Sequence, residues 1–290
     1  MEGFWGRVKK ANHKWGGGGS IKGKFYWMEI YYYLNMKTTS LVALLLLVAI
    51  ASATYDVSMF YCGFGANFCG QSTDDDVNPK TRTVILAFVN TQPDGSVIAD
   101  DANFPTALIS KWKNSGKRVV ISVGGQNGNW PNVFASATST NNFIAALANI
   151  VVTYGLDGVD LDIENYLATP RTVANMILAL RTALGPNKLI IVSPEDVTVM
   201  QEFGVPDPDS VSGYYNYFVN IIKLADQAIS YYQPQAYNNW YEEPAGTLSY
   251  LQNVYLNWRN LQGMMTWAKP IANFTGVDGN KLLIGVEAST

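Results

Sequence analysis

The chain has 290 residues, of which 48% are hydrophobic, 13% aromatic and 15% charged, a composition that excludes a disordered protein and supplies ample material for a core. Its single histidine, His13, lies in an N-terminal segment that we expect to be removed. A chain without histidine cannot use a Ser-His-Asp triad, a Cys-His pair or an imidazole-ligated metal. We therefore expect no cofactor and no metal, and a chemistry carried by carboxylates, tyrosines and amides.

Residues 1–53 are predicted to lie outside the folded domain. Residues 41–53 (LVALLLLVAIASA) form an apolar run that follows Met36-Lys37 and ends in an A-x-A sequence, so 36–53 resembles a secretory signal peptide. The run is shorter than the roughly 20 residues that a membrane span needs. We interpret 1–35 as an upstream extension, with Met36 as the working initiator; the alternative is a signal anchor with a long cytoplasmic tail. One domain is expected over 54–290.

The charge of this domain argues against two classes of partner. Without residues 1–53 the chain carries 13 Lys or Arg against 21 Asp or Glu, a net charge of −8. An excess of negative charge disfavours binding to nucleic acid or to an anionic membrane. We expect a secreted protein that acts as a monomer and does not associate with membranes after signal cleavage.

Two cysteines remain in this domain, Cys62 and Cys69, in the sequence YCGFGANFC. In a secreted chain a short-loop disulfide between them is the expected arrangement. A zinc site would lack further ligands, and a catalytic thiol would lack a base.

Apolar strands alternate with helices along the rest of the chain. Strands are predicted at 55–61, 83–90, 118–123, 157–164, 189–193, 229–237 and 282–288, and helices at 107–112, 143–154, 172–184, 217–228 and 248–261. This order indicates βαβ units and a parallel sheet covered on both faces. No G-x-G-x-x-G follows the first strand, which disfavours a dinucleotide-binding fold. Functional-looking residues gather at the C-terminal ends of several strands, which is typical of a (β/α)8 TIM barrel, an α/β fold.

The segment 157–164, DGVDLDIE, is the most informative in the chain. Its apolar residues alternate with Asp160, Asp162 and Glu164 in the period of two that a strand shows, so one face is apolar and the other carries three carboxyl groups. Neighbouring carboxylates in a confined space cannot all ionise cheaply, so at least one is expected to hold a proton near neutral pH, which favours acid catalysis. The alternative is an edge strand whose acidic face meets water. Asp157, on the opposite face, is expected to organise the start of the strand.

Four motifs resemble those of one enzyme family. DGVDLDIE matches the DxxDxDxE motif of glycoside hydrolase family 18, the chitinase family, at every fixed position. Residues 122–125 (SVGG) resemble the family's SxGG motif, and 235–238 (QAYN) are similar to the Q-x-Y-N of hevamine-like and small bacterial chitinases. Residues 192–195 (VSPE) resemble the fifth-strand motif. The motifs occur in the family's order, and the resemblance covers residues 55–288.

The resemblance implies a role for each acid. Glu164, nearest the open end of the barrel, would be the general acid for the glycosidic oxygen. Asp162 lies too close to it to activate a water as in an inverting enzyme, and the family instead uses substrate assistance, in which the N-acetyl oxygen attacks the anomeric carbon to give an oxazolinium ion with net retention. Asp162 would orient the acetamide N–H, Asp160 would share its proton with Asp162, and the hydroxyl of Tyr237 would hold the acetamide oxygen.

Further residues are expected around these acids. Ser122 would bind the carboxyl groups, or is an ordinary loop serine, while Gly124 and Gly125 would let the backbone pass closely. Gln235 and Asn238 are expected to bind sugar hydroxyls or the N-acetyl group, with a structural amide as the alternative for Asn238. The aromatic residues near strand ends that could stack on sugars, or equally lie in the core or at the rim, are Tyr61, Trp130, Trp240 and Tyr241.

The function that the resemblance implies is a secreted chitinase that hydrolyses β-1,4 linkages between N-acetylglucosamine units. An endo-β-N-acetylglucosaminidase acting on N-glycans, a chitin-binding lectin and an inactive fragment are the alternatives, although a lectin usually lacks the acid that Glu164 supplies. Asn273 lies in an N-glycosylation acceptor sequence, which matters only in a eukaryote.

One feature departs from the family. Its barrel closes with an eighth strand that carries a tryptophan, whereas only seven strands are predicted here. Trp267 lies in MMTW, which resembles that final motif, but it precedes the seventh strand. We therefore expect a barrel that lacks its eighth strand at the C-terminus and exposes strand edges, and a chain that is poorly stable or inactive.

Overall fold

A computed structural model of the chain describes residues 57–62, 64, 72–99, 103–199, 207–211, 216–237, 247–260 and 277–285. The chain divides into two compact units, 1–55 and 56–290, and every described residue belongs to the second. The predictions that lie outside the described residues are those for 1–53, Cys69, Asn238, Trp240, Tyr241, Trp267 and Asn273. Within the described ranges, no helix has the length and apolar character needed to cross a membrane.

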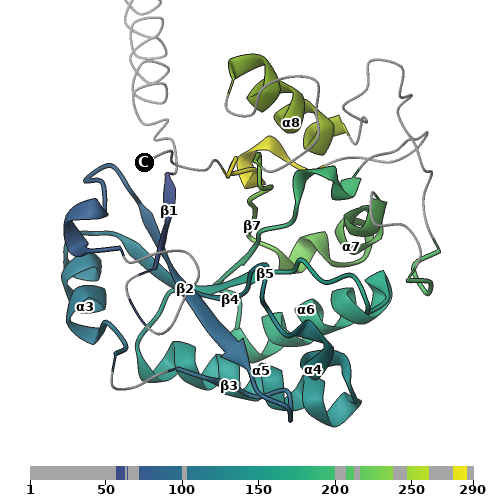
Figure 1. Ribbon diagram of the computed structural model, residues 1–290, viewed down its shortest axis with the longest axis horizontal. Helices are drawn as coiled ribbons and strands as arrows, with labels where there is room; N and C mark the ends of the chain where they lie inside the picture. The colour runs from purple at the N-terminus through teal and green to yellow at the C-terminus, as the bar shows by residue number, and fades with distance from the viewer. Residues whose placement is uncertain are drawn as a thin grey trace, which may run out of the picture. The chain divides into compact units, whose positions relative to one another are not determined.

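A curled parallel sheet forms the centre of the second unit (Figure 1). Its strands lie side by side in chain order: β1 (Ser58–Tyr61), β2 (Thr83–Thr91), β4 (Arg118–Gly124), β5 (Gly158–Asp162), β6 (Leu189–Val192) and β7 (Tyr231–Tyr232). The short β3 (Val97–Ile98) returns antiparallel to β2. Beyond β7 the parallel pairing continues through the bridges Tyr232–Leu282 and Gln235–Gly285. Strands that follow one another in both chain and sheet are the arrangement of a (β/α)8 barrel.

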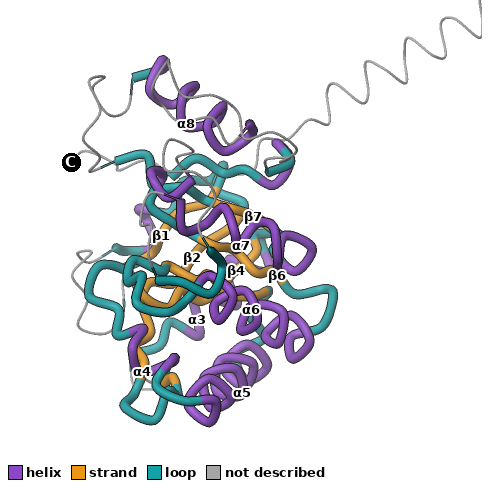
Figure 2. Tube along the Cα trace, turned by 90° about the vertical axis from the view of Figure 1, so that its right-hand side faces the viewer, coloured by secondary structure: helices purple, strands orange, loops and turns teal. Residues whose placement is uncertain are grey.

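Helices cover the outer face of this sheet. They are α3 (Thr106–Asn114), α4 (Trp130–Phe134), α5 (Ala137–Thr153), α6 (Pro170–Leu184), α7 (Tyr217–Ala225) and α8 (Leu248–Asn260). In Figure 2, α5, α6 and α7 follow one another beside the strands, in agreement with their direct contacts. Local sequence sets several ends: the Thr169 hydroxyl accepts from the Thr172 amide before Pro170, and Gly185, with φ of 78°, ends α6.

The two faces of the sheet have different surroundings. Side chains that point outward pack with the helices in the main core, among them Val159, Leu161 and Ile163. Side chains that point inward form a smaller apolar cluster of Ile85, Val120 and Ile191, which packs against Phe60, Leu189 and Tyr231. The Ser58 hydroxyl donates to Gln233 Oε1 at 2.5 Å and so links β1 to the chain after β7. This contact shows that the sheet curls toward closure.

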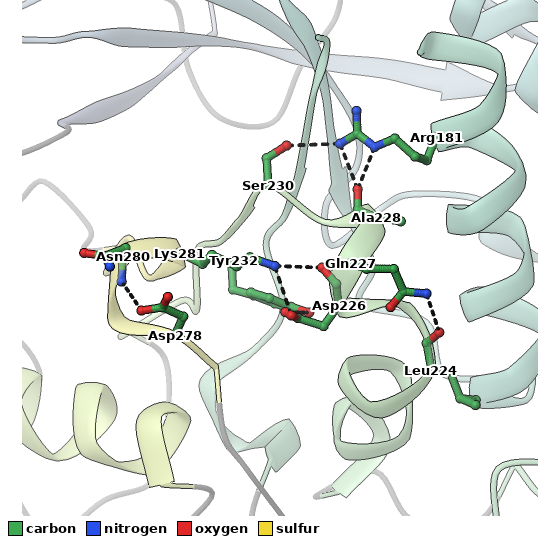
Figure 3. A network of polar contacts seen from close by, with 10 residues as sticks. All are labelled: Arg181, Leu224, Asp226, Gln227, Ala228, Ser230, Tyr232, Asp278, Asn280 and Lys281. Atoms are coloured by element: carbon green, nitrogen blue, oxygen red, sulfur yellow. Dashed lines mark hydrogen bonds and ion pairs between the residues drawn. The ribbon is translucent and has the colours of Figure 1, made fainter. Parts of the chain in front are cut away.

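Polar contacts hold the start of β7 against its neighbours (Figure 3). Arg181, in the last turn of α6, donates to the Ala228 carbonyl and to the Ser230 hydroxyl. Lys281 donates to the carbonyl and carboxylate of Asp226, and the Tyr232 hydroxyl donates to the same carboxylate. The segment 277–285 is therefore fixed by an ion pair to Asp226, ahead of β7, as well as by backbone pairing to Tyr232 and Gln235.

The α/β fold with (β/α)8 architecture is confirmed, and so are the predicted starts of β2, β4 and β6. Several details differ. Residues 282–285, predicted to lie in a strand, pair only at Leu282 and Gly285. Residues 229–237, predicted as one strand, are regular only at 231–232 and pair again at Gln235. Residues 137–142 extend α5 at its N-terminus, because Ser136 accepts a hydrogen bond from the Ser139 amide. The short β3 and α4 were not predicted. The loss of an eighth strand stays a prediction.

Candidate active site

Three acidic side chains follow one another up the inner face of β5. Asp160 and Asp162 are 0% and 4% exposed, and Glu164, two residues past the end of the strand, is half-buried. Val159, Leu161 and Ile163 lie on the opposite face in the main core. The alternation predicted from DGVDLDIE is therefore confirmed, and the carboxyl groups point into the barrel.

Asp160 is held by one hydroxyl from each neighbouring strand. Ser122, its partner in the β4–β5 register, donates to Oδ2 at 2.5 Å, and Ser193, just after β6, donates to Oδ1 at 2.7 Å. Burial raises the pKa of Asp160 to about 6, although the two hydroxyl groups act in the opposite direction. Asp160 can therefore gain or lose a proton near neutral pH.

Asp162 is the carboxyl group that most strongly resists ionisation. Burial raises its pKa well above the ordinary value, and the charges of Asp160, Glu164 and Glu195 raise it further. Its hydrogen bond with Glu164 raises the pKa of Asp162 and lowers that of Glu164, which makes Asp162 the donor of that bond. Burial and the neighbouring charges therefore favour a protonated Asp162 that faces Glu164.

Glu164 also favours its protonated form. Burial raises its pKa and the charge of Glu195 adds to the rise, while hydrogen bonds from Gln235 and Asp162 oppose it. A carboxylic acid with a raised pKa at the mouth of a barrel is suited to general acid catalysis.

Gln235 joins the acids from the other side of the site. Its amide nitrogen lies 2.8 Å from Asp162 Oδ1, 3.1 Å from Glu164 Oε1 and 3.1 Å from the Ser193 carbonyl. The backbone of Gln235 is fixed by parallel bridges to Glu195 and Gly285. In the structure this amide contacts the acids, whereas the sequence suggested contacts with a sugar.

The end of β5 is fixed through the carbonyl oxygen of Asp162. This oxygen accepts from the Gly125 amide and from the indole nitrogen of Trp130, both at 3.0 Å. Gly124 has φ of 117°, and a Cβ at this position would lie 2.0 Å from the same oxygen. The SVGG sequence therefore lets β4 approach β5 where the acids lie.

The structure places two of the aromatic residues named from the sequence in the core. Tyr61 is 3% exposed, and its ring packs edge-on against Trp112 beneath α3. Trp130 is 1% exposed and packs against Phe134 and Phe143. Neither residue has a free ring face for a sugar, so of the two alternatives left open by the sequence the structure supports the core position for both. Tyr61 at the end of β1 and Trp130 at the start of α4 both turn their rings into the core.

Other predicted residues lie where the strand parity places them. Tyr237 is half-buried and follows Gln235. Asp157 lies at the opposite end of β5, where it accepts from Lys113 at 2.7 Å and from the Val119 amide at 2.8 Å. The Cys62 amide donates to the Ser72 hydroxyl, and the pairing of Cys62 with Cys69 stays a prediction.

Several residues at the site were given no role from the sequence, among them Ser193, described above, and Glu195 and Phe88. Glu195 accepts from the Tyr166 hydroxyl at 2.6 Å and raises the pKa of both Asp162 and Glu164. Phe88 lies at a register shift near the end of β2, with its ring 5.9 Å from that of Phe60 and close to Gly125. An acid directly after a strand, as in VSPE, is the pattern that could have identified Glu195.

Comparisons with known proteins agree with this geometry. A family profile described as "Glycosyl hydrolases family 18" matches residues 59–290. "Exochitinase 1" of Streptomyces olivaceoviridis is 33% identical over 113 residues, 34% of this chain and 18% of that protein. "Chitinase D" of Niallia circulans is 26% identical over 207 residues, 62% of this chain and 37% of that protein. The matched part therefore spans well under half the length of either relative.

The fold also has relatives among solved structures. The crystal structure of a family GH18 chitinase from Chromobacterium violaceum matches with a TM-score of 0.62 at 25% identity, over 81% of this chain and 66% of that chain. The sheet and the column of acids described above thus occur in a chain whose arrangement is similar to that of a known hydrolase.

Proposed function

Because the chain belongs to glycosyl hydrolase family 18, we propose that it is a secreted chitinase that cleaves β-1,4 linkages between N-acetylglucosamine units with retention of configuration. The observation that supports this most is the column of Asp160, Asp162 and Glu164, in which raised pKa values and shared hydrogen bonds keep protons available at the barrel mouth. The chitinase names of the relatives support the substrate class.

In the first step Glu164 donates its proton to the glycosidic oxygen, and the sugar departs as an alcohol. The acetamide oxygen of the retained sugar attacks its own anomeric carbon as the glycosidic bond breaks, which gives an oxazolinium ion. Asp162 lies on the same strand face as Glu164 and is hydrogen-bonded to it, which disfavours Asp162 as the water-activating carboxylate of an inverting mechanism. As the family membership implies, the substrate supplies the nucleophile.

Asp162 assists this attack when it turns from Glu164 toward the acetamide N–H. As a carboxylate it stabilises the positive charge that develops on the oxazolinium ring. Asp160 receives the proton that Asp162 gives up, which its pKa of about 6 and its two serine hydroxyl donors allow. The hydroxyl of Tyr237 holds the acetamide oxygen in line with the anomeric carbon.

In the second step Glu164, now a carboxylate, removes a proton from a water molecule. The water oxygen attacks the anomeric carbon on the face that the leaving group vacated, and the oxazolinium ring opens to the acetamide. Two inversions at one carbon give retention. Glu164 is protonated again, and the proton on Asp160 returns to Asp162 as Asp162 turns back toward Glu164.

Turnover of an aryl chitobioside that releases a chromophore tests the activity. We expect Glu164→Gln to lower kcat by at least about 100-fold, since it removes the general acid, while binding of a chitin oligosaccharide by calorimetry changes little. Asp209→Asn, at an exposed ion pair with Arg171, is the matched control and should keep wild-type kcat. Near-wild-type turnover in Glu164→Gln would contradict the assignment. Cleavage of a labelled N-glycan in preference to chitin oligosaccharides would indicate the endo-β-N-acetylglucosaminidase alternative.

The secretion part of the proposal rests on residues 36–53 and on the Cys62–Cys69 pair. Expression in a secreting host should yield a protein in the medium that begins at residue 54, as read by mass spectrometry. An intact mass lower by two hydrogen atoms than that of the reduced form would report the disulfide. A monomer is expected in light scattering.

A further inference from the structure

Glu195 lies beside the catalytic acids although it is not part of DGVDLDIE. It lies just past the end of β6, after Ser193 and Pro194. Its backbone pairs with that of Gln235, whose side-chain amide contacts both Asp162 and Glu164. This pairing places Glu195 at the level of the upper two acids, on the neighbouring strand end.

The side chain of Glu195 is held by the segment that carries Glu164. The Tyr166 hydroxyl donates to Glu195 Oε2 at 2.6 Å, and Tyr166 is only two residues beyond Glu164. The Tyr166 ring is in turn fixed edge-on against Tyr217 of α7, with ring centroids 4.9 Å apart. The chain that leaves β5 is therefore anchored to the end of β6 immediately after the general acid.

We propose that Glu195 is a positioning residue for Glu164: it anchors the segment after β5 through Tyr166 and places a second carboxyl group beside the acids. The inference rests on the proposed function only in the assignment of Glu164 as general acid.

Electrostatics support this role independently of the anchoring contact. The charge of Glu195 raises the pKa of Glu164 and of Asp162, because a second negative charge nearby disfavours ionisation. The groups that act on the Glu164 carboxyl come from three elements: Asp162 on β5, Glu195 after β6 and Gln235 after β7. Burial raises the pKa of Glu164, and of these three residues Glu195 is the one whose charge raises it further. Asp162 and Gln235 lower the pKa of Glu164 through hydrogen bonds.

Glu195→Gln separates the charge from the contact, since the amide oxygen can still accept from Tyr166. We expect the pKa of Glu164 to fall by about 1, a size that a like charge several ångströms away in a partly buried site produces. Carbon-13 NMR titration of labelled glutamate side chains measures it, with the Glu164 resonance identified by its loss in Glu164→Gln. The alkaline limb of the kcat profile on an aryl chitobioside should move to lower pH by the same amount. Asp209→Asn, which removes an exposed charge, should leave the pKa of Glu164 unchanged.

Tyr166→Phe tests the anchor while the charge stays. We expect kcat to fall by about tenfold with little change in KM, since one hydrogen bond that orients the acid is lost. A kcat equal to that of wild type would overturn the anchoring role, and equal Glu164 pKa values in wild type and Glu195→Gln would overturn the charge role. The NMR titration requires no substrate, so its result holds whether or not the protein hydrolyses chitin. Absence of turnover in folded wild-type protein would contradict the proposed function alone.

Discussion

The indole nitrogen of Trp130 lies 3.0 Å from the carbonyl oxygen of Asp162, and this bond joins α4 to the last residue of β5. The Gly125 amide donates to the same oxygen. Regular strand pairing ends at this residue, so the two donors determine the direction in which the chain continues to Glu164. Trp130 thus acts on the site from behind the strand, through its N–H group, with its ring in the core.

Trp130→Phe should therefore impair catalysis although it preserves an aromatic ring in the core. Loss of the N–H leaves the carbonyl with one donor, which should cost about 1 kcal/mol of stability and lower kcat by about tenfold. Trp112→Phe is a matched control, because Trp112 is also buried and donates its indole N–H, but to Asp74 at 2.8 Å. It should lose similar stability by urea unfolding and keep wild-type kcat. Equal kcat losses in both variants would contradict the role of Trp130.

A methyl group at Gly124 should disrupt the same junction. The added Cβ would lie 2.0 Å from the Asp162 carbonyl oxygen, which is backbone and cannot yield cheaply. We expect Gly124→Ala to lose several kcal/mol of unfolding free energy and nearly all turnover. Gly155→Ala, also at positive φ but with no atom within 4 Å of the new Cβ, should cost only about 1 kcal/mol and keep kcat. Similar unfolding curves for the two variants would show that φ alone, and not the contact with β5, makes glycine necessary.

Periodicity in the sequence predicts the barrel well where each segment is apolar on one face and bounded by clear stops. Thr169-Pro170 and Gly185 bound α6 in both the prediction and the structure. Periodicity fails where tertiary contacts decide. Residues 229–237 read as one strand, yet Pro234 interrupts the pairing and leaves two separate bridged positions. The five-residue α4 is too short to show a period.

The same distinction applies to the site. Strand parity places Asp160, Asp162 and Glu164 on one face because side chains alternate, whatever packs on them. It does not reveal whether an aromatic side chain near a strand end faces the barrel or the helices, and Trp130 faces the helices. Glu195 reaches the site only through the pairing of its backbone with Gln235, a residue 40 positions further along the chain. The VSPE sequence marks an acid directly after a strand, but the contact of this acid with Gln235 is set by strand order and cannot be read locally.

Arg181 should be a strong determinant of stability. Its guanidinium donates to the carbonyls of Ala228, Gly185 and Lys188 and to the Ser230 hydroxyl, and burial lowers its pKa. Arg181→Met would leave partly buried carbonyls without a donor, so we expect a loss of about 2–4 kcal/mol in urea unfolding.

The control is Arg171→Met at the other end of the same helix. Arg171 makes an exposed ion pair with Asp209, with side chains 44% and 59% exposed, and such pairs contribute less than about 1 kcal/mol. A comparable loss in both variants would mean that the contacts of Arg181 do not hold α6 to β7.

The buried carboxyl of Asp160 should make stability fall as pH rises. Its pKa is about 6 in the folded chain and near 3.8 when unfolded, so the folded state binds more protons between these values. The contribution of protonated Asp160 is fully present below about pH 4 and is lost as pH rises through 6, up to on the order of 3 kcal/mol. Asp160→Asn cannot ionise. The unfolding free energy of this variant minus that of wild type should therefore increase between pH 4.5 and pH 8. Asp209→Asn removes an exposed carboxylate whose pKa is lowered, so its difference from wild type should stay flat over this window. Parallel stability curves for wild type and Asp160→Asn would show that burial does not raise the pKa of Asp160 in the folded chain.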